Sequence, residues 1–135
     1  MLEASAKEIL IVDDEEVMRE FLSEVLEDFQ VETACDGNEA ISKMKNKSYD
    51  LIITDMKMPG VSGEEVVQFA KKTSPDSKII VISGYSSLFS VGNTTRFGIS
   101  AFLAKPFTIK QIRGEVEKSL KASEVEPDAN EADNA

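Results

Sequence analysis

The chain contains no histidine, no tryptophan and a single cysteine, Cys35. Without histidine the sequence cannot supply a Ser-His-Asp triad, a helical two-histidine zinc site or a phosphohistidine, so any phosphohistidine must lie on a partner. One cysteine excludes an internal disulfide framework, and its neighbours Ala34 and Asp36 give no metal-ligand spacing. This composition fits a reducing compartment.

Long apolar runs and a basic surplus are also lacking. No apolar segment approaches the length of a membrane span, and residues 1–6 have neither the cationic start nor the apolar stretch of a signal peptide. With 25 acidic against 15 basic residues the net charge is −10, which disfavours binding to nucleic acid or to an anionic membrane. We therefore expect a cytoplasmic protein without direct nucleic-acid or membrane contacts.

The length bounds the domain organisation. A chain of 135 residues, 41% hydrophobic and 30% charged, can bury one ordinary core and has no room for a second domain. We expect an N-terminal extension over residues 1–6, a domain over residues 7–121 and an acidic disordered tail over residues 122–135, which has almost nothing apolar to bury.

Short apolar runs alternate with helix-like stretches, which predicts a parallel sheet flanked by helices. The more polar segment Gln30–Ala34 is typical of an edge strand. The apolar runs are Ile9–Val12, Leu51–Thr54, Lys78–Ile82 and Ala101–Ala104.

Side-chain acceptors followed three residues later by Glu or Gln mark three helix starts. Apolar residues at helical spacing predict faces that cover the sheet, with Val17, Phe21 and Val25 in the first helix. A fourth helix between Ser86 and Gly98 is weakly supported because glycine, asparagine and threonine occupy its middle. The capping pairs are Asp36 with Glu39, Ser62 with Glu65 and Thr108 with Gln111, and the last helix carries Ile112, Val116 and Leu120.

Polar residues follow the predicted strands at their carboxyl ends. Because parallel strands all end at one edge of the sheet, these residues converge in the crevice where ligands of open α/β folds bind. They are Asp13, Asp14, Asp55, Ser83, Lys105 and Pro106.

Three carboxylates brought together repel one another, and a bound cation is one way to relieve the repulsion. With only oxygen donors available, the set suits Mg²⁺, which retains open positions for phosphate oxygens. Asp55 can then act as a carboxylate nucleophile that forms an acyl phosphate, while Lys105 and Ser83 offer an ammonium and a hydroxyl to the phosphoryl oxygens. Together these residues predict a phosphoryl-transfer site.

Four motifs in this order resemble the response-regulator receiver family of two-component systems, in its single-domain, chemotaxis-type form. The resemblance covers roughly residues 7–121. The motifs are Ile9-Leu-Ile-Val-Asp13-Asp14-Glu-Glu, Thr54-Asp55-Met-Lys-Met-Pro59-Gly60, Val81-Ile-Ser83-Gly84 and Phe102-Leu-Ala-Lys105-Pro106-Phe107.

The resemblance implies a flavodoxin-like, doubly wound α/β fold with a five-stranded parallel sheet of order 2-1-3-4-5 and five flanking helices. It implies that Asp55 accepts the phosphoryl group and that Mg²⁺ is held by the carboxylates of Asp13, Asp14 and Asp55 and by the main-chain carbonyl of Lys57. Lys105 would sense the phosphoryl group.

A switch and partners follow from the same resemblance. Ser83 would move toward the phosphoryl group, Phe102 would swing into the vacated space, and Pro106 would follow a cis peptide bond. The partners would be a sensor histidine kinase or a histidine phosphotransfer protein, and a downstream protein bound by the fourth helix, fifth strand and fifth helix.

Other interpretations remain open. Each of these residues taken alone is more often a turn, cap or surface residue than a functional one, and Phe102 fits static packing on the sheet as well as a moving switch.

Three other functions are alternatives to a phosphoryl-accepting receiver. An aspartyl-nucleophile phosphatase of the haloacid-dehalogenase type needs a second Asp two residues after the nucleophile, where this chain has Lys57. A flavodoxin-like electron carrier needs a loop after the first strand that donates hydrogen bonds to phosphate, whereas the acidic run Asp13-Asp14-Glu15-Glu16 would repel it. A scaffold that is never phosphorylated is disfavoured because every expected residue is present.

Overall fold

Five short strands form one parallel sheet in the order β2-β1-β3-β4-β5, which confirms the predicted topology. The computed structural model describes residues 6–84 and 98–124. All four strand pairs are parallel. The strands are β1 (Glu8–Val12), β2 (Gln30–Ala34), β3 (Leu51–Asp55), β4 (Lys78–Ser83) and β5 (Ala101–Ala104).

Burial follows each strand's place in the sheet. The central strand β3 is buried along its whole length, whereas the edge strand β2 is half-exposed over most of its residues. From β1 the chain runs outward to β2 and then returns to the far side of β1 to form β3. Strand order therefore reverses between β1 and β3, and ligand crevices of open α/β sheets lie at the carboxyl ends of strands at such a point.

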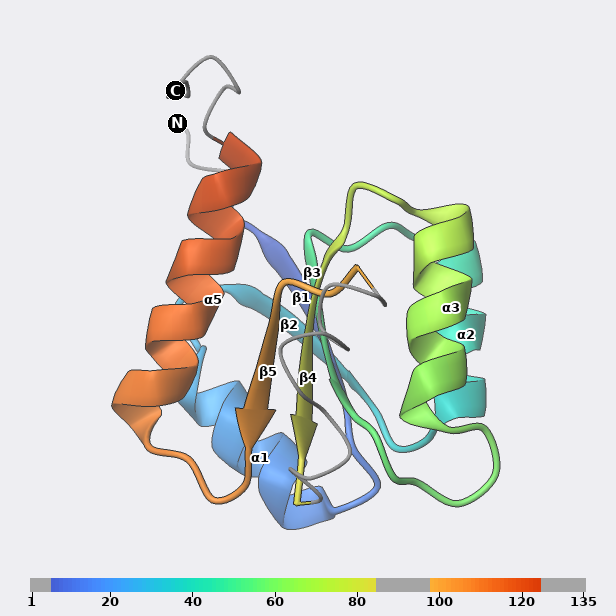
Figure 1. Cartoon of the computed structure of the whole chain (residues 1–135), viewed down its shortest axis with the longest axis horizontal. Helices are drawn as coiled ribbons and strands as arrows, with labels where there is room; N and C mark the ends of the chain where they lie inside the picture. The colour runs from blue at the N-terminus through green and yellow to red at the C-terminus, as the bar shows by residue number, and fades with distance from the viewer. Residues whose placement is uncertain (1–5, 85–97, 125–135) are drawn as a thin grey trace.

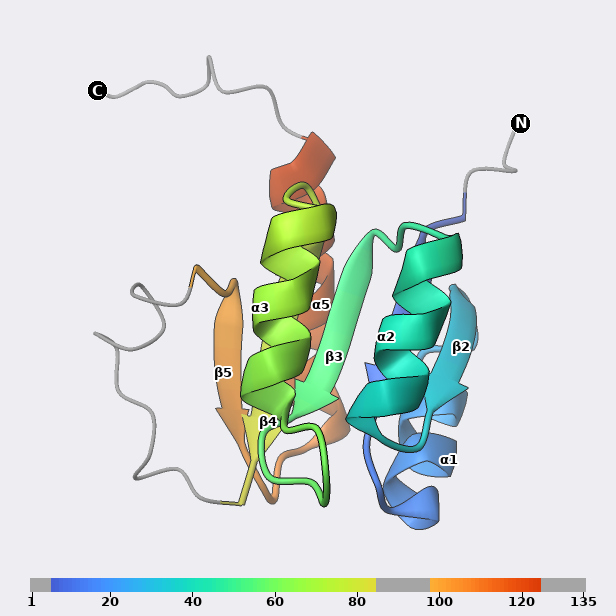
Figure 2. The same ribbon diagram turned by 90° about the vertical axis from the view of Figure 1, so that its right-hand side faces the viewer.

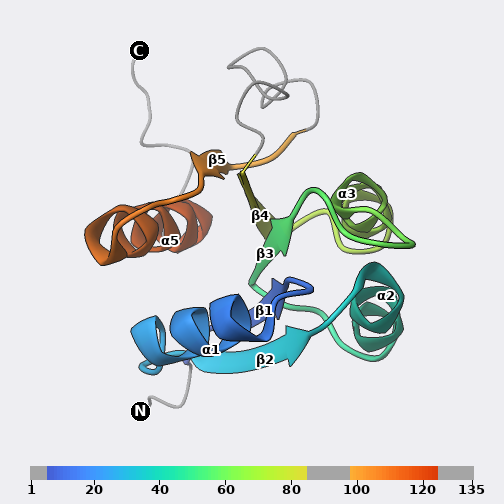
Figure 3. The ribbon, with the colours of Figure 1, turned by 90° about the horizontal axis from the view of Figure 1, so that it is seen from below.

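In the described part of the chain, helices cover both faces of the sheet (Figures 1 and 3). Helices α1 (Glu16–Val25) and α5 (Ile109–Glu124) lie on one face. Helices α2 (Gly37–Asn46) and α3 (Gly63–Thr73) lie side by side on the other (Figure 2). The four helices confirm the layers expected from the sequence over the described residues. The expected fourth helix falls on residues 85–97, outside the part of the chain that the structure describes.

Side-chain caps begin three of these helices as predicted. The side chains of Asp36 and Ser62 accept hydrogen bonds from the main-chain amides of Glu39 and Glu65. Thr108 and Gln111 form a reciprocal capping box, in which each side chain accepts from the other residue's main-chain amide. The caps satisfy amides that the first helical turn leaves without partners.

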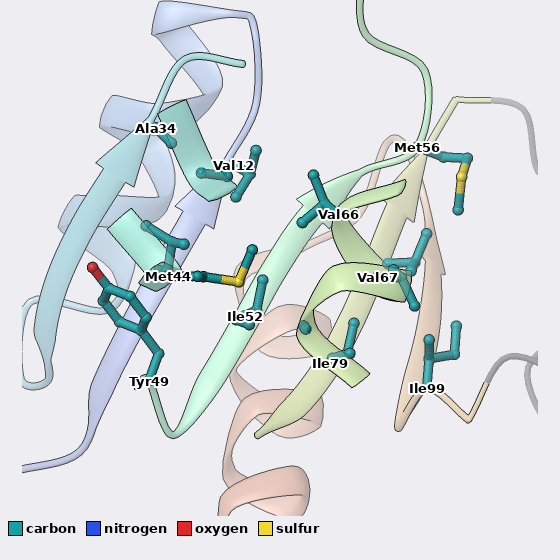
Figure 4. Packing of buried hydrophobic residues seen from close by; sticks show 14 residues of the cluster. Val12, Ala34, Met44, Tyr49, Ile52, Met56, Val66, Val67, Ile79 and Ile99 are labelled. Atoms are coloured by element: carbon teal, nitrogen blue, oxygen red, sulfur yellow. The ribbon is translucent and has the colours of Figure 1, made fainter. Parts of the chain in front are cut away.

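Alternate residues of the central strands pack into two hydrophobic clusters, one on each face. In β1, Leu10 faces α2 and α3, whereas Ile9 and Ile11 face α1 and α5. Figure 4 shows the first cluster, in which Met44 of α2 and Val66 of α3 lie over the sheet. In the second cluster the predicted face of α5, formed by Ile112, Val116 and Leu120, is buried.

The predicted face of α1 is wrong at its first residue. Val17 is 79% exposed, whereas Leu22, which was not in the predicted series, is fully buried. Phe21 and Val25 are partly buried against the cluster. The face of α1 on the cluster instead begins at Met18, three residues before Phe21, so Val17 lies beside this face.

The predicted domain end at residue 121 lies inside α5, which continues to Glu124. Ala and Ser at positions 122 and 123 are compatible with a helix, and the first residue that would break it is Pro127. Residues 1–5 and 125–135, which contain most of the predicted extension and tail, lie outside the described residues.

Candidate functional site

The predicted site residues converge at the carboxyl edge of the sheet, which Figure 3 views end-on. Asp13 directly follows β1, and Asp55 is the last residue of the neighbouring strand β3. Ser83 ends β4, and Lys105 directly follows β5. Residues far apart in the sequence therefore share one edge because all the strands run in the same direction.

Asp13, Asp14 and Asp55 form an acidic pocket. One carboxylate oxygen of each lies within 4.8 Å of the others. Asp13 is fully buried, Asp55 is 6% exposed, and Asp14 is exposed. The set thus combines two buried carboxylates with one that opens to solvent, and all of its donor atoms are oxygens.

Main-chain hydrogen bonds fix the loop that carries Asp13. Its amide donates to the carbonyl of Ala34 at 3.1 Å, and its Oδ1 accepts from the amide of Glu15 at 2.9 Å. The guanidinium of Arg19, one turn into α1, donates to the carbonyl of Asp13 at 2.8 Å. The buried carboxylate therefore has a fixed position between β1 and the start of α1.

Lys105 brings a positive charge into the pocket. Its Nζ lies 3.3 Å from Oδ2 of Asp13, 3.2 Å from Oδ2 of Asp55 and 3.5 Å from Oε1 of Glu15, and its side chain is 17% exposed. Its main-chain amide donates to the carbonyl of Ser83 at 2.8 Å, which holds the loop against β4. The peptide bond between Lys105 and Pro106 is cis, which confirms that prediction.

Burial and charge pull the pocket's pKa values in opposite directions. Desolvation raises the pKa of Asp13 above its ordinary value, against the hydrogen bond from Glu15 and the charge of Lys105. Burial lowers the pKa of Lys105, but attraction to Asp13 and Asp55 outweighs it and the net pKa is raised. One ammonium thus faces more carboxylates than it can neutralise, and such a set suits an added hard cation.

The remaining predicted residues lie around this pocket. Ser83 is fully buried one residue beyond the Asp55–Ile82 pair, and the amide of Lys57 donates to Oδ1 of Asp55 at 3.4 Å. Phe102 is half-buried in β5 and packs against the cluster under α2 and α3. These placements agree with the predicted positions, and the moving roles of Ser83 and Phe102 remain predictions.

Two residues at this edge were missed in the sequence. A Cβ added to Gly63 would overlap the main-chain oxygen of Asp55, and the Gly63 amide donates to the carbonyl of Met56 at 3.0 Å. Glu15 reaches Lys105, as described above. In the sequence Gly63 is an ordinary residue after the Ser62 cap, and Glu15 is only one of four consecutive acidic residues that would repel a phosphate, so neither was assigned a role in the site.

The sheet order and the two helical layers define a flavodoxin-like, doubly wound α/β domain with an acidic pocket where strand order reverses. The chain belongs to the response regulator receiver domain family, which residues 9–117 match. Receiver domains of this family take phosphoryl groups from histidine kinases and regulate downstream effectors. No helix among residues 6–84 and 98–124 is long and apolar enough to cross a membrane.

Two proteins with similar sequences are also response-regulator proteins or contain a matching segment. The chain is 34% identical over 116 residues to the sporulation initiation phosphotransferase F of Bacillus subtilis (strain 168), an alignment covering 84% of this chain and 94% of that protein. It is 33% identical over 135 residues to the DNA-binding transcriptional regulator NtrC of Azospirillum brasilense, an alignment covering 96% of this chain but 28% of that regulator.

A solved structure agrees with the fold. The response regulator protein TrrA of Thermotoga maritima, in complex with Mg²⁺ and BeF, is 36% identical and superposes with a TM-score of 0.76, covering 84% of this chain and 99% of that one.

Proposed function

We propose that Asp55 accepts a phosphoryl group from a phosphohistidine on a partner protein, with the help of Mg²⁺, and that the modification changes binding to a second partner. The observation that carries this proposal is the convergence of Asp55 with Asp13, Asp14 and Lys105 in one pocket. The histidine kinases that supply receiver domains fit the donor chemistry, since this chain has no histidine.

The chemical step uses the carboxylate of Asp55 as a nucleophile. One carboxylate oxygen forms a bond to phosphorus, the donor's phosphorus–nitrogen bond breaks, and its electron pair stays with the imidazole. The product is an acyl phosphate on Asp55. Oδ2 of Asp55 lies 3.2 Å from Lys105 Nζ, so an ammonium is already beside the place where phosphoryl oxygens arrive.

The donor set fits Mg²⁺, which favours oxygen ligands. The carboxylates of Asp13, Asp14 and Asp55 and the main-chain carbonyl of Lys57 would hold the ion. When bound, Mg²⁺ supplies positive charge that offsets the carboxylates and the phosphoryl oxygens. The relative from Thermotoga maritima, whose complex contains Mg²⁺ and BeF, supports this assignment.

Ser83 and Phe102 provide the conformational response in this proposal. Ser83 is fully buried at the end of β4, and its hydroxyl turns toward the new phosphoryl group. Phe102 lies on the neighbouring edge strand, where it pairs with Val81 in register, and its ring moves into the vacated space. The change alters the face formed by β5 and α5, which binds the downstream protein. The predicted fourth helix, also assigned to this surface from the sequence, lies outside the described residues.

The proposed role is a stoichiometric acceptor rather than a turnover enzyme. A phosphatase built on an aspartyl nucleophile needs a general acid beside it, whereas Lys57 occupies the second position after Asp55 and contributes a main-chain amide there. Loss of the phosphoryl group then depends on hydrolysis of the acyl phosphate itself.

Intact-protein mass after incubation with acetyl phosphate tests this function. Wild type should gain one phosphoryl group in the presence of Mg²⁺ and none after chelation, and Asp55→Asn should gain none. Asp50→Asn is the matched control, because Asp50 precedes the same strand at its opposite end. A phosphorylated Asp55→Asn protein would contradict the proposal.

A further inference from the structure

Glu15 occupies an unusual place beside the pocket. It is the N-cap residue of α1, but its side chain makes no capping hydrogen bond. Instead its Oε1 lies 3.5 Å from Nζ of Lys105, while 64% of its side chain remains exposed. Glu15 is therefore the carboxylate on the solvent side of the lysine that the proposed function places next to the phosphoryl group.

Capping does not explain a glutamate here. Ser, Thr, Asp and Asn satisfy the first helical amides from an N-cap position, whereas the longer Glu side chain is a poorer cap. The main-chain amide of Glu15 serves the site by donating to Oδ1 of Asp13 at 2.9 Å. Its carboxylate is left to interact with Lys105.

The contact has an electrostatic consequence for an approaching donor. Lys105 is shared between the buried carboxylates of Asp13 and Asp55 and the exposed one of Glu15. A small phosphodonor carries negative charge and must pass the mouth of this pocket. Glu15 repels that charge and also holds the ammonium that would attract it.

We infer that Glu15 is a specificity-determining residue that disfavours phosphorylation of Asp55 by small anionic phosphodonors, so that a donor docked by protein–protein contacts is favoured. The inference rests on the proposed function of Asp55. Small donors depend on the local field for their encounter with the site, whereas a partner protein adds binding contacts elsewhere on the surface.

The test is the apparent second-order rate constant for phosphorylation by acetyl phosphate at saturating Mg²⁺, measured at low and high salt. Glu15→Gln should raise this rate constant about three- to tenfold at low ionic strength, and added salt should shrink the gain. Glu16→Gln is the matched control. It removes the same charge from the next residue, which is also exposed and for which the described structure gives no contact with Lys105. It should change the rate constant less than twofold.

Equal gains in the two variants would show a bulk charge effect and overturn the inference. An unchanged rate constant for Glu15→Gln would also overturn it. A lower rate constant would do the same, because it would indicate that Glu15 positions Lys105 for the reaction. Phosphorylation of Glu15→Gln alone, with none of wild type, would support it.

Adding Asp55→Asn to Glu15→Gln separates the two proposals. A phosphorylated double variant would refute the proposed function, whereas equal rate constants for Glu15→Gln and Glu16→Gln would refute only the role of Glu15. If neither wild type nor Glu15→Gln is phosphorylated, the role of Glu15 is refuted.

Discussion

Nζ of Lys105 lies 3.2 Å from Oδ2 of Asp55, although 50 residues separate them in the sequence. The contact crosses β4, because Asp55 ends β3 and Lys105 follows β5. It ties two strand ends together through charge, and it places a cation where the proposed reaction adds negative oxygens.

Replacing Lys105 by methionine should tighten Mg²⁺ binding. The ammonium partly neutralises Asp13 and Asp55, so its removal leaves these carboxylates with more charge for an added cation to offset. We expect about tenfold tighter binding, the scale on which one neighbouring charge shifts a carboxyl equilibrium. The measurement is the rise in Tm with Mg²⁺ concentration, which reports binding to the folded state.

Lys110→Met is the control for this prediction. It removes an exposed charge from the first turn of α5 and should leave the rise in Tm with Mg²⁺ unchanged. A weaker Mg²⁺ response in Lys105→Met would refute this account of the lysine.

Adding a methyl group at Gly63 should disturb the site and the fold together. The new Cβ would overlap main-chain atoms of Asp55 and Met56, which cannot move aside as a flexible side chain could. We expect Gly63→Ala to lower the free energy of unfolding by at least about 2 kcal/mol and to slow phosphorylation. Gly114→Ala has nothing within 4 Å of its added Cβ and lies inside α5, so it should raise stability by about 0.5–1 kcal/mol. Urea unfolding of both variants measures these changes. A Gly63→Ala variant as stable as wild type would contradict the close approach of Gly63 to the main chain of Asp55 and Met56.

The corrected face of α1 predicts opposite results for two apolar residues. Leu22→Ala empties a fully buried position and should lower the free energy of unfolding by about 3 kcal/mol. Val17→Ala changes a side chain that is 79% exposed and should stay within about 0.5 kcal/mol of wild type. Denaturant unfolding at neutral pH distinguishes the two, and comparable losses would restore the face first predicted from the sequence.

Alkaline pH should destabilise the protein through Tyr49. Burial, together with the hydrogen bond that its hydroxyl donates to Glu32, raises the pKa of Tyr49 from the ordinary value of 10.0 to about 12. Because the folded-state pKa is the higher one, this contribution is fully present below pH 10 and is lost as the pH rises toward 12. The loss should reach about 3 kcal/mol. Unfolding curves across this range should decline less steeply for Tyr49→Phe, and parallel declines would refute the shift.

The sheet was predictable because its signals are local. Apolar runs such as Leu51–Thr54 mark buried strands, and Thr108 with Gln111 marks a helix start without reference to the rest of the chain. The acidic pocket was predictable for a related reason: once the strands are parallel, Asp13 and Asp55 must meet at one edge.

Features that depend on tertiary contact were not predictable. The clash that forbids a side chain at Gly63 exists only because α3 begins against the main chain of Asp55. The contact between Glu15 and Lys105 joins the start of α1 to the loop after β5. Val17 was misplaced because periodicity gives the spacing of an apolar face but only approximately its direction.

The most direct test is to locate the phosphoryl group on the chain. After phosphorylation with acetyl phosphate and Mg²⁺, borohydride reduction converts an aspartyl phosphate to homoserine, and peptide mass spectrometry identifies the residue changed. We expect homoserine at position 55, with Asp13 and Asp14 unmodified. Conversion of Asp13 or Asp14 instead, or a phosphoryl group retained on a serine or threonine, would contradict it.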